Sequence, residues 1–308
     1  MTYLLLLLGL LVLLLGGKFL VDGASAIAAR MGLSPGLIGL TVVAFGTSAP
    51  ELLVCITAAL KGANDITMGN VVGSNISNIT LVLGLSALVY PIFLSRSTLK
   101  LDYPFTLISS VLFFLMAFNG KISLFEGLVL LFFLILLNWY FFKKIERVEF
   151  SEDDALILKK KSKWLSLLMI IMGASGLYLG SELFVENGSL IAQTWGISER
   201  VIGITVIAVG TSLPELATSI LAAVKKETDL ALGNILGSNI MNVLSIVGLT
   251  AVIKPIQVAP EFIYGDFLWM LGFTLILLPI MRINLTISRI NGALLLLLYL
   301  VYLYVLIV

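Results

Sequence analysis

Histidine is absent from the sequence, and cysteine occurs once, as Cys55. Without histidine, the chain lacks the commonest transition-metal ligand and the usual proton carrier near neutral pH. A single cysteine excludes a disulfide within the chain and a cysteine metal cluster. Charged residues make up only 12% of the sequence, against about 25% in soluble domains. No basic stripe is present, which argues against nucleic acid as a partner.

Apolar residues are abundant instead. They make up 59% of the 308 residues, and the mean hydropathy is +1.11. So much apolar surface does not fit inside one water-soluble core, and the composition predicts a polytopic membrane protein with the lipid bilayer as its surroundings. The first apolar run lacks a basic leading segment and a small-residue cleavage site, so we expect it to be retained as a helix.

Ten stretches are long and apolar enough to cross a bilayer, which predicts an all-α fold of ten transmembrane helices. They are residues 3–29, 34–61, 66–92, 102–118, 122–143, 164–192, 198–224, 229–253, 260–281 and 288–308. The one long hydrophilic connection divides them into a first five-helix repeat (1–143), a linker (144–163) and a second five-helix repeat (164–308). With the N-terminus outside, fourteen Lys and Arg residues lie on the cytoplasmic side and four outside. This bias predicts a cytoplasmic linker and a plasma (inner) membrane location.

The two halves repeat each other. A shift of 164 positions aligns residues 21–85 with 185–249 without a gap, and 31 of the 65 positions are identical. The shared residues include glycine, proline, asparagine and glutamate, which two unrelated apolar helices would not share. Because each half has an odd number of spans, the repeats are predicted to have inverted topology. Inverted repeats are typical of secondary transporters that use alternating access around a site near the midplane.

The first repeated motif is GTSAPE at 46–51 and GTSLPE at 210–215. Proline lacks an N–H and clashes with the preceding turn, so Pro50 and Pro214 should disturb their helices. We expect the disturbance to release backbone carbonyls, plausibly those of Ala44 and Ala208, as oxygen ligands. Broken backbone is tolerated at membrane depth where it lines a cavity or coordinates an ion.

The same motif carries carboxylates and hydroxyls. An intramembrane carboxylate costs about 2.5–3.5 kcal/mol even on the lenient insertion scale, and the chain has one in each half, Glu51 and Glu215. Two such charges at matched positions require a compensating cation. Hydroxyl oxygens lie next to them in the sequence, on Thr47, Ser48, Thr211 and Ser212.

The second repeated motif is GNVVGSN at 69–75 and GNILGSN at 233–239. Helical spacing puts its polar side chains on one face, which gives the stripes Asn70, Ser74, Asn78 and Asn234, Ser238, Asn242. All candidate ligands in both motifs are oxygens, which hard cations prefer. Ca²⁺ takes 6–8 oxygens in a flexible geometry, and this set argues against zinc, copper or iron.

At these motifs the sequence resembles the sodium/calcium exchanger family of the calcium/cation antiporter superfamily. The resemblance implies four core helices around a central group of cation sites, with several Na⁺ exchanged for one Ca²⁺ and no organic cofactor. It implies calcium-ligand roles for Glu51 and Glu215. It implies sodium or calcium roles for Thr47, Ser48, Ser74, Asn78, Thr211, Ser212 and Ser238, and for the carbonyls of Ala44 and Ala208. It further implies that helices 3–29 and 164–192 slide as gates and that a monomer suffices.

The sequence departs from the family at Asn242, where members often have aspartate. With Asn242 the stoichiometry and the coupling ion stay open, so Ca²⁺/H⁺ and K⁺-dependent exchange remain alternatives, and an ion channel is a further one. An enzyme is not expected: Ser48 and Ser212 have no visible base nearby, and no ATP-binding G-x-x-x-x-G-K-[ST] motif is present.

Several of these residues have a purely structural interpretation as well. The glutamates would be protonated and hydrogen-bonded, the motif glycines would serve helix packing, and Asn78 and Asn242 would bond between helices. Asp65 and Asp229 are predicted as N-caps. Asp22 and Glu186, in the long first helix of each half, are expected at solvated helix ends, with a salt bridge as the alternative.

Overall fold

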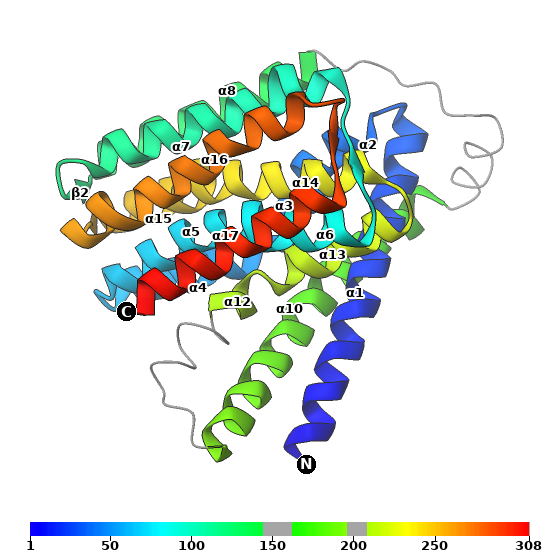
Figure 1. Cartoon of the computed structure of the whole chain (residues 1–308), viewed down its shortest axis with the longest axis horizontal. Helices are drawn as coiled ribbons and strands as arrows, with labels where there is room; N and C mark the ends of the chain where they lie inside the picture. Colours follow the sequence, from blue (N-terminus) through cyan, green and yellow to red (C-terminus); the bar gives the residue numbers. More distant parts are fainter. Residues whose placement is uncertain (144–161, 196–207, 308) are drawn as a thin grey trace.

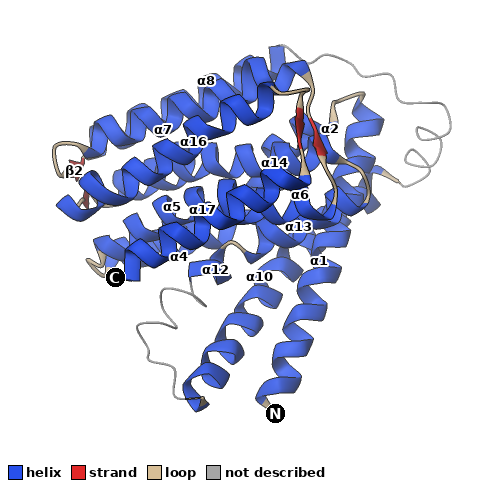
Figure 2. Ribbon diagram, in the orientation of Figure 1, coloured by secondary structure: helices blue, strands red, loops and turns tan. Residues whose placement is uncertain are grey.

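A computed structural model describes residues 1–143, 162–195 and 208–307 of the chain. The regular secondary structure of the described part is helical apart from four two-residue strands, and short loops connect the elements (Figure 2). Eight helical runs in it are long and apolar enough to cross a membrane, and a bent helix pair makes a ninth. The remaining predicted span, 198–224, falls partly outside the described residues. The all-helical membrane fold is confirmed, and the count agrees with ten spans.

The elements of the first half follow the predicted spans closely. They are α1 (Thr2–Met31), α2 (Pro35–Ile38), η1 (Gly39–Val43), α3 (Ala44–Thr47), α4 (Ala49–Leu60), α5 (Asn64–Ser77), η2 (Asn78–Val82), α6 (Leu83–Val89), β1 (Ile92–Phe93), η3 (Thr98–Asp102), α7 (Tyr103–Ala117), β2 (Lys121–Ile122) and α8 (Leu124–Lys143). The η elements are π-helical turns, which are frequent at functional sites.

The second half repeats this order. Its described elements are α10 (Lys163–Thr194), α12 (Ala208–Thr211), α13 (Leu213–Val224), α14 (Thr228–Met241), η5 (Asn242–Val247), α15 (Gly248–Ile253), β3 (Ile256–Gln257), η6 (Phe262–Asp266), α16 (Phe267–Arg282), β4 (Thr286–Ile287) and α17 (Arg289–Ile307). The π-helical turns η2 and η5 begin at Asn78 and Asn242, which the 164-residue shift aligns.

The strands join the two halves at opposite ends of the molecule. β1 pairs antiparallel with β4, and β2 pairs antiparallel with β3. The same shift carries β1 onto β3, yet their two sheets lie at opposite ends in Figure 2. Equivalent elements of the two halves therefore point in opposite directions, as the odd number of spans predicts.

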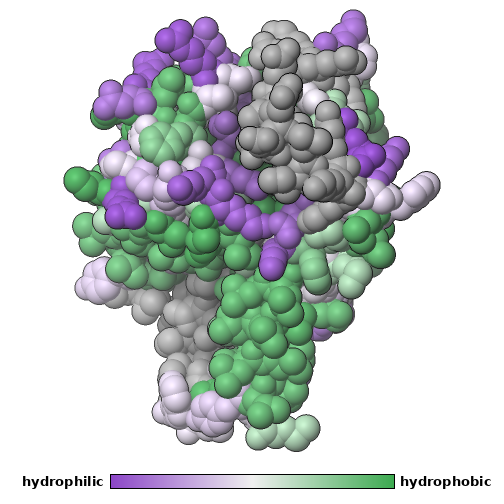
Figure 3. Space-filling view, turned by 90° about the vertical axis from the view of Figure 1, so that its right-hand side faces the viewer, coloured by the Kyte–Doolittle hydropathy of each residue, from purple (hydrophilic) through white to green (hydrophobic). Residues whose placement is uncertain are grey.

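The two longest helices, α1 and α10, pack along each other and extend obliquely from the bundle (Figure 1). Glycines bring their backbones together: a Cβ at Gly173 would lie 2.5 Å from the Leu20 nitrogen, and one at Gly16 would lie 2.6 Å from the Leu177 nitrogen. Small residues at such crossings are the usual means of close helix packing in membranes. Exposed leucines of α1 contribute to the hydrophobic lower part of the face in Figure 3.

The helices α5 and α14 cross the middle of the bundle, and α14 is almost entirely buried. A Cβ at Gly233 would lie 2.3 Å from the Gly36 carbonyl oxygen, and one at Gly237 would lie 2.4 Å from that of Leu40. The packing role of these two motif glycines is thus confirmed.

The predicted N-caps are wrong by two positions, because the N-cap residues are Ala63 and Glu227. α5 begins at Asn64 and α14 at Thr228, so Asp65 and Asp229 lie inside the first turns and provide no side-chain cap. Carboxylates are favourable there because they face the positive end of the helix dipole.

Two polar contacts attach α1 to the connection between α13 and α14. Lys225 forms an ion pair with Asp22, and the Ser25 hydroxyl donates to Glu227 at 2.5 Å. Burial raises the pKa of Glu227, and the bond from Ser25 partly offsets that rise. The salt bridge is therefore the correct alternative for Asp22, while Glu186, its counterpart in α10, is exposed.

Substitution of Gly173 by alanine should destabilise the protein. The added Cβ would meet the backbone of Leu20, which has no rotamer by which to move away, and such overpacking costs about 1–3 kcal/mol. Gly272→Ala is the matched control, because no described atom lies within 4 Å of its added Cβ. Thermal unfolding in detergent should show a lower Tm for Gly173→Ala and an unchanged or higher Tm for Gly272→Ala. Equal Tm values would contradict the close α1–α10 contact.

Candidate cation-binding site

Both halves contain a helix break one residue after the threonine of the GTSxPE motif. In the first half, α3 ends at Thr47 and α4 begins at Ala49, with a 45° bend between the two helical segments. Ser48 lies in the break with φ −88° and ψ 3°, and Ser212 has nearly the same angles, −89° and 4°. The disturbance that Pro50 and Pro214 predict is therefore present in both halves.

The prediction that the Ala44 carbonyl is released from hydrogen bonding is wrong. The Ala44 oxygen still accepts the Ser48 N–H at 3.0 Å and the Thr47 hydroxyl at 3.3 Å. Ala208 begins α12. A ligand role for the Ala44 oxygen would have to compete with these two hydrogen bonds, and both carbonyls stay predictions.

The paired glutamates occupy the first turns of α4 and α13, just after the breaks. Glu51 is 2% exposed and Glu215 is 1% exposed, and Ser48, three residues before Glu51, contacts the Glu215 carboxylate. Each lies at the positive end of its helix dipole, which favours a negative charge. Two carboxylates are therefore brought together inside the bundle from opposite repeats.

The hydroxyl of Ser48, in the first repeat, contacts a residue of the second repeat. The pattern S-x-x-E at Ser48 and Glu51 is that of a capping box, yet Ser48 makes no side-chain cap bond to its own helix. Its hydroxyl donates to Glu215 Oε1 at 3.0 Å, and the Ser238 hydroxyl lies 3.5 Å from the same oxygen. The first half thus supplies a donor to the carboxylate of the second.

Thr47 connects the same region to α14. Its hydroxyl lies 3.3 Å from Asn234 Oδ1 and 3.4 Å from the Ser238 hydroxyl. Thr47 and Ser238 are both completely buried. Thr211, the counterpart of Thr47, ends α12 and is half-buried.

Four asparagines form a clasp between the repeats. Asn78 Nδ2 donates to Asn239 Oδ1 at 3.0 Å, and Asn242 Nδ2 donates to Asn75 Oδ1 at 3.0 Å. Asn239 Nδ2 also donates to the Asn75 carbonyl at 3.2 Å. The interhelical hydrogen bond considered for Asn78 and Asn242 is therefore present. Asn75 and Asn239 are not among the ligands predicted from the sequence, although they are the last residues of the repeated GSN and could have been found there.

Buried oxygens without a hydrogen-bond partner gather at this site. Among the described residues, five such atoms belong to predicted ligands: Glu51 Oε2, Glu215 Oε2, Ser74 Oγ, Asn78 Oδ1 and Asn242 Oδ1. A buried polar atom left unsatisfied costs about 1–3 kcal/mol, and more if it is charged. Five of them on one set of residues fit cations, which oxygen lone pairs would coordinate.

Ser212 differs from its counterpart Ser48. Its hydroxyl lies 2.8 Å from that of Ser77, and both residues are buried. Ser77 is a functional candidate that could not be found from the repeat. The second half has Met241 at the matching position, so Ser77 is not one of the residues that the two halves share.

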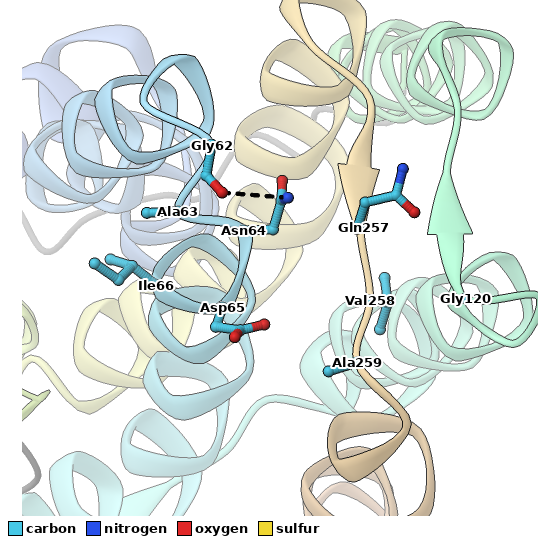
Figure 4. Close-up of a pocket in the computed structure, with 9 residues that line it drawn as sticks. All are labelled: Gly62, Ala63, Asn64, Asp65, Ile66, Gly120, Gln257, Val258 and Ala259. Atoms are coloured by element: carbon cyan, nitrogen blue, oxygen red, sulfur yellow. Dashed lines mark hydrogen bonds between the residues drawn. The ribbon is translucent and has the colours of Figure 1, made fainter.

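A separate cavity of about 440 Å³ lies near the start of α5 and beside β2 and β3 (Figure 4). Its lining includes Asp65, Asn64 and Gln257, but neither glutamate and none of the predicted ligands. Figure 4 shows the Asn64 amide bonded to the Gly62 carbonyl rather than turned to a ligand. The described part of the chain contains no cluster of three or more His, Cys, Asp or Glu.

Comparisons with known proteins agree on one family. The protein-family model described as "sodium/calcium exchanger protein" matches residues 1–143 and 165–308 of this chain. The sodium/calcium exchanger MaX1 of Methanosarcina acetivorans is 34% identical, with 99% of this chain and 98% of that protein aligned. The putative antiporter CaxA of Alkalimonas amylolytica is 37% identical, with 97% of each aligned. A solved structure of the sodium-calcium exchanger NCX_Mj, soaked with zero Na⁺ and Ca²⁺, superposes with a TM-score of 0.85 at 32% identity, covering 99% of this chain and 98% of that one.

Removal of Asn239 should weaken the bundle. Asn239→Ala would leave the buried Asn78 amide without its acceptor, at about 1–3 kcal/mol, and would remove one of the hydrogen bonds to the Asn75 carbonyl. Asn119→Ala, at an exposed turn, is the control. Thermal unfolding in detergent should give a clearly lower Tm for Asn239→Ala than for Asn119→Ala. An unchanged Tm would mean that the asparagine clasp does not hold the repeats together.

Proposed function

The chain belongs to the sodium/calcium exchanger family, and on that premise we propose that Glu51, Glu215 and the oxygens around them form its ion-exchange site. The protein is a membrane antiporter that exchanges Na⁺ for Ca²⁺. The observation that carries the site assignment is the group of five buried, unpartnered oxygens on predicted ligand residues.

The charges of the site suit one calcium ion. Two ionised carboxylates balance one Ca²⁺, and the site offers further amide and hydroxyl oxygens toward the 6–8 that Ca²⁺ takes. Sodium ions compete for the same oxygens, so Ca²⁺ leaves when Na⁺ enters. Three Na⁺ would exceed the two carboxylates by one positive charge, because the amide of Asn242 adds no negative charge.

Alternating access requires the site to open to one side at a time. We place the N-terminus outside and the linker 144–163 on the cytoplasmic side of the plasma membrane, from the distribution of Lys and Arg. In the proposed cycle α1 and α10 slide together past the core, because their glycine-lined contact makes them one unit. The ion pair between Asp22 and Lys225 then breaks and reforms as α1 moves. One chain contains both repeats and hence a whole site, so a monomer suffices.

Radioactive Ca²⁺ uptake into proteoliposomes tests this function. Vesicles loaded with Na⁺ and diluted into buffer free of Na⁺ and K⁺ should accumulate Ca²⁺. Glu51→Gln and Glu215→Gln should each reduce uptake to the level of empty vesicles, because either change leaves one carboxylate for a divalent ion. Glu261→Gln, at an exposed position, should retain uptake.

A failure of this assay would be informative. Uptake that needs a pH gradient or K⁺ in place of Na⁺ would reassign the coupling ion. Na⁺-dependent uptake that survives both glutamate substitutions would overturn the site.

Asn242→Asp should make transport depend on pH. Asn242 Nδ2 donates to Asn75 Oδ1. An ionised aspartate at position 242 has no proton to donate, so its carboxylate oxygen would face the Asn75 oxygen and repel it. A protonated aspartate can still donate, so the variant should approach wild type at low pH and fall below it as the pH rises. The measurement is the ratio of variant to wild-type uptake rates across pH. A ratio that stays constant would contradict a donor role for position 242.

A further inference from the structure

The hydroxyls of Ser77 and Ser212 form a hydrogen bond in which either oxygen could be the donor. Ser77 donates its proton to the Ser74 carbonyl at 3.1 Å, and its oxygen lies 2.8 Å from the Ser212 oxygen. A serine hydroxyl has one proton and two acceptor lone pairs. With the Ser77 proton on the Ser74 carbonyl, the lone pairs of Ser77 accept and Ser212 is the donor in the pair.

The equivalent bond is missing from the other half. Met241 stands where the repeat would place a second Ser77, and it lines a small cavity together with Ser48. Methionine offers Ser48 only a weak sulfur acceptor. The proton of Ser48 goes to Glu215 Oε1 instead, at 3.0 Å. Two serines at matched positions thus give their protons to different kinds of acceptor.

This difference makes the two carboxylates unequal. Glu215 accepts from Ser48 and is within reach of Ser238. Among the described residues, the Oε2 atom of each glutamate is buried without a partner, so the difference concerns Oε1, where Glu215 accepts from Ser48. Ser212, the counterpart of Ser48, contacts Ser77 instead, and a proton that Ser212 gives to Ser77 is not available to Glu51.

We infer that Ser77 is a positioning residue for sodium: it holds the Ser212 proton away from Glu51, so that the Ser212 oxygen and the Glu51 carboxylate both present lone pairs to Na⁺. This inference rests on the proposed exchange site. Without Ser77, the Ser212 hydroxyl is free to donate to Glu51, as Ser48 does to Glu215, and Na⁺ then has to displace that proton. Ca²⁺ depends less on Ser77, because both carboxylates hold it and Ser77 contacts neither.

The test is the Na⁺ dependence of Ca²⁺ exchange in proteoliposomes for Ser77→Ala. We expect the half-saturating Na⁺ concentration to rise about fivefold, which corresponds to the free energy of one typical hydrogen bond. The half-saturating Ca²⁺ concentration should change by less than about twofold. Ser77→Thr keeps the hydroxyl and should restore the wild-type value. Ser86→Ala is the matched control: it removes another fully buried serine hydroxyl, further along the same helical run, that has no partner in the described residues.

Position 241 provides the reverse experiment. Met241→Ser offers Ser48 a hydroxyl acceptor, which should release Glu215 and lower the half-saturating Na⁺ concentration relative to Met241→Ala. The inference is overturned if wild type exchanges normally and Ser77→Ala leaves Na⁺ dependence unchanged, or if Ser77→Ala and Ser86→Ala shift it equally. It is also overturned if Na⁺ and Ca²⁺ dependences shift together. Absence of Na⁺-dependent uptake in wild type would instead refute the proposed function.

Discussion

Two carboxylates, one from each half and both buried inside a membrane bundle, are the constraint on which the rest of this structure depends. Glu51 and Glu215 are almost completely inaccessible, and neither has a basic residue as a hydrogen-bond or ion-pair partner in the described part of the chain. An intramembrane charge is costly unless it is compensated. The breaks before α4 and α13 place each carboxylate at a helix N-terminus, and the neighbouring amides and hydroxyls add oxygens rather than cations. On the proposed function, the transported cations supply the missing positive charge.

The repeats hold this site by contacts that cross between them. The asparagine clasp joins η2 with α14 and η5 with α5, and the Ser48 hydroxyl reaches from one break to the carboxylate of the other. The same amides that join the repeats also keep one oxygen each without a partner, on Asn78 and Asn242. In the proposed site, packing would use the amide nitrogens of these side chains and ion binding their oxygens, so one residue could serve both without conflict.

The two halves are alike in sequence motif but unequal in contacts. Asp22 of α1 pairs with Lys225, whereas its counterpart Glu186 is exposed. Ser212 bonds to Ser77, whereas Ser48 bonds to Glu215. A transporter in one conformation has to be asymmetric about its pseudo-two-fold axis. The Asp22 contact can change as α1 moves, but the difference between Ser77 and Met241 is built into the sequence and persists in every state.

The sequence by itself determined the membrane class, the inverted repeat, the helix breaks and the identity of most candidate ligands. It could do so because an apolar chain makes each intramembrane polar residue conspicuous, and repetition at 164 residues separates shared function from local packing. Only the tertiary structure decided how those residues are connected. The Ala44 carbonyl keeps its hydrogen bonds, Asp65 and Asp229 lie within their helices, and Ser77 joins the site although its repeat counterpart is methionine. The physical reason is that a hydroxyl or amide chooses its partner among all neighbours within about 3 Å, and here those neighbours are often more than a hundred residues away along the chain.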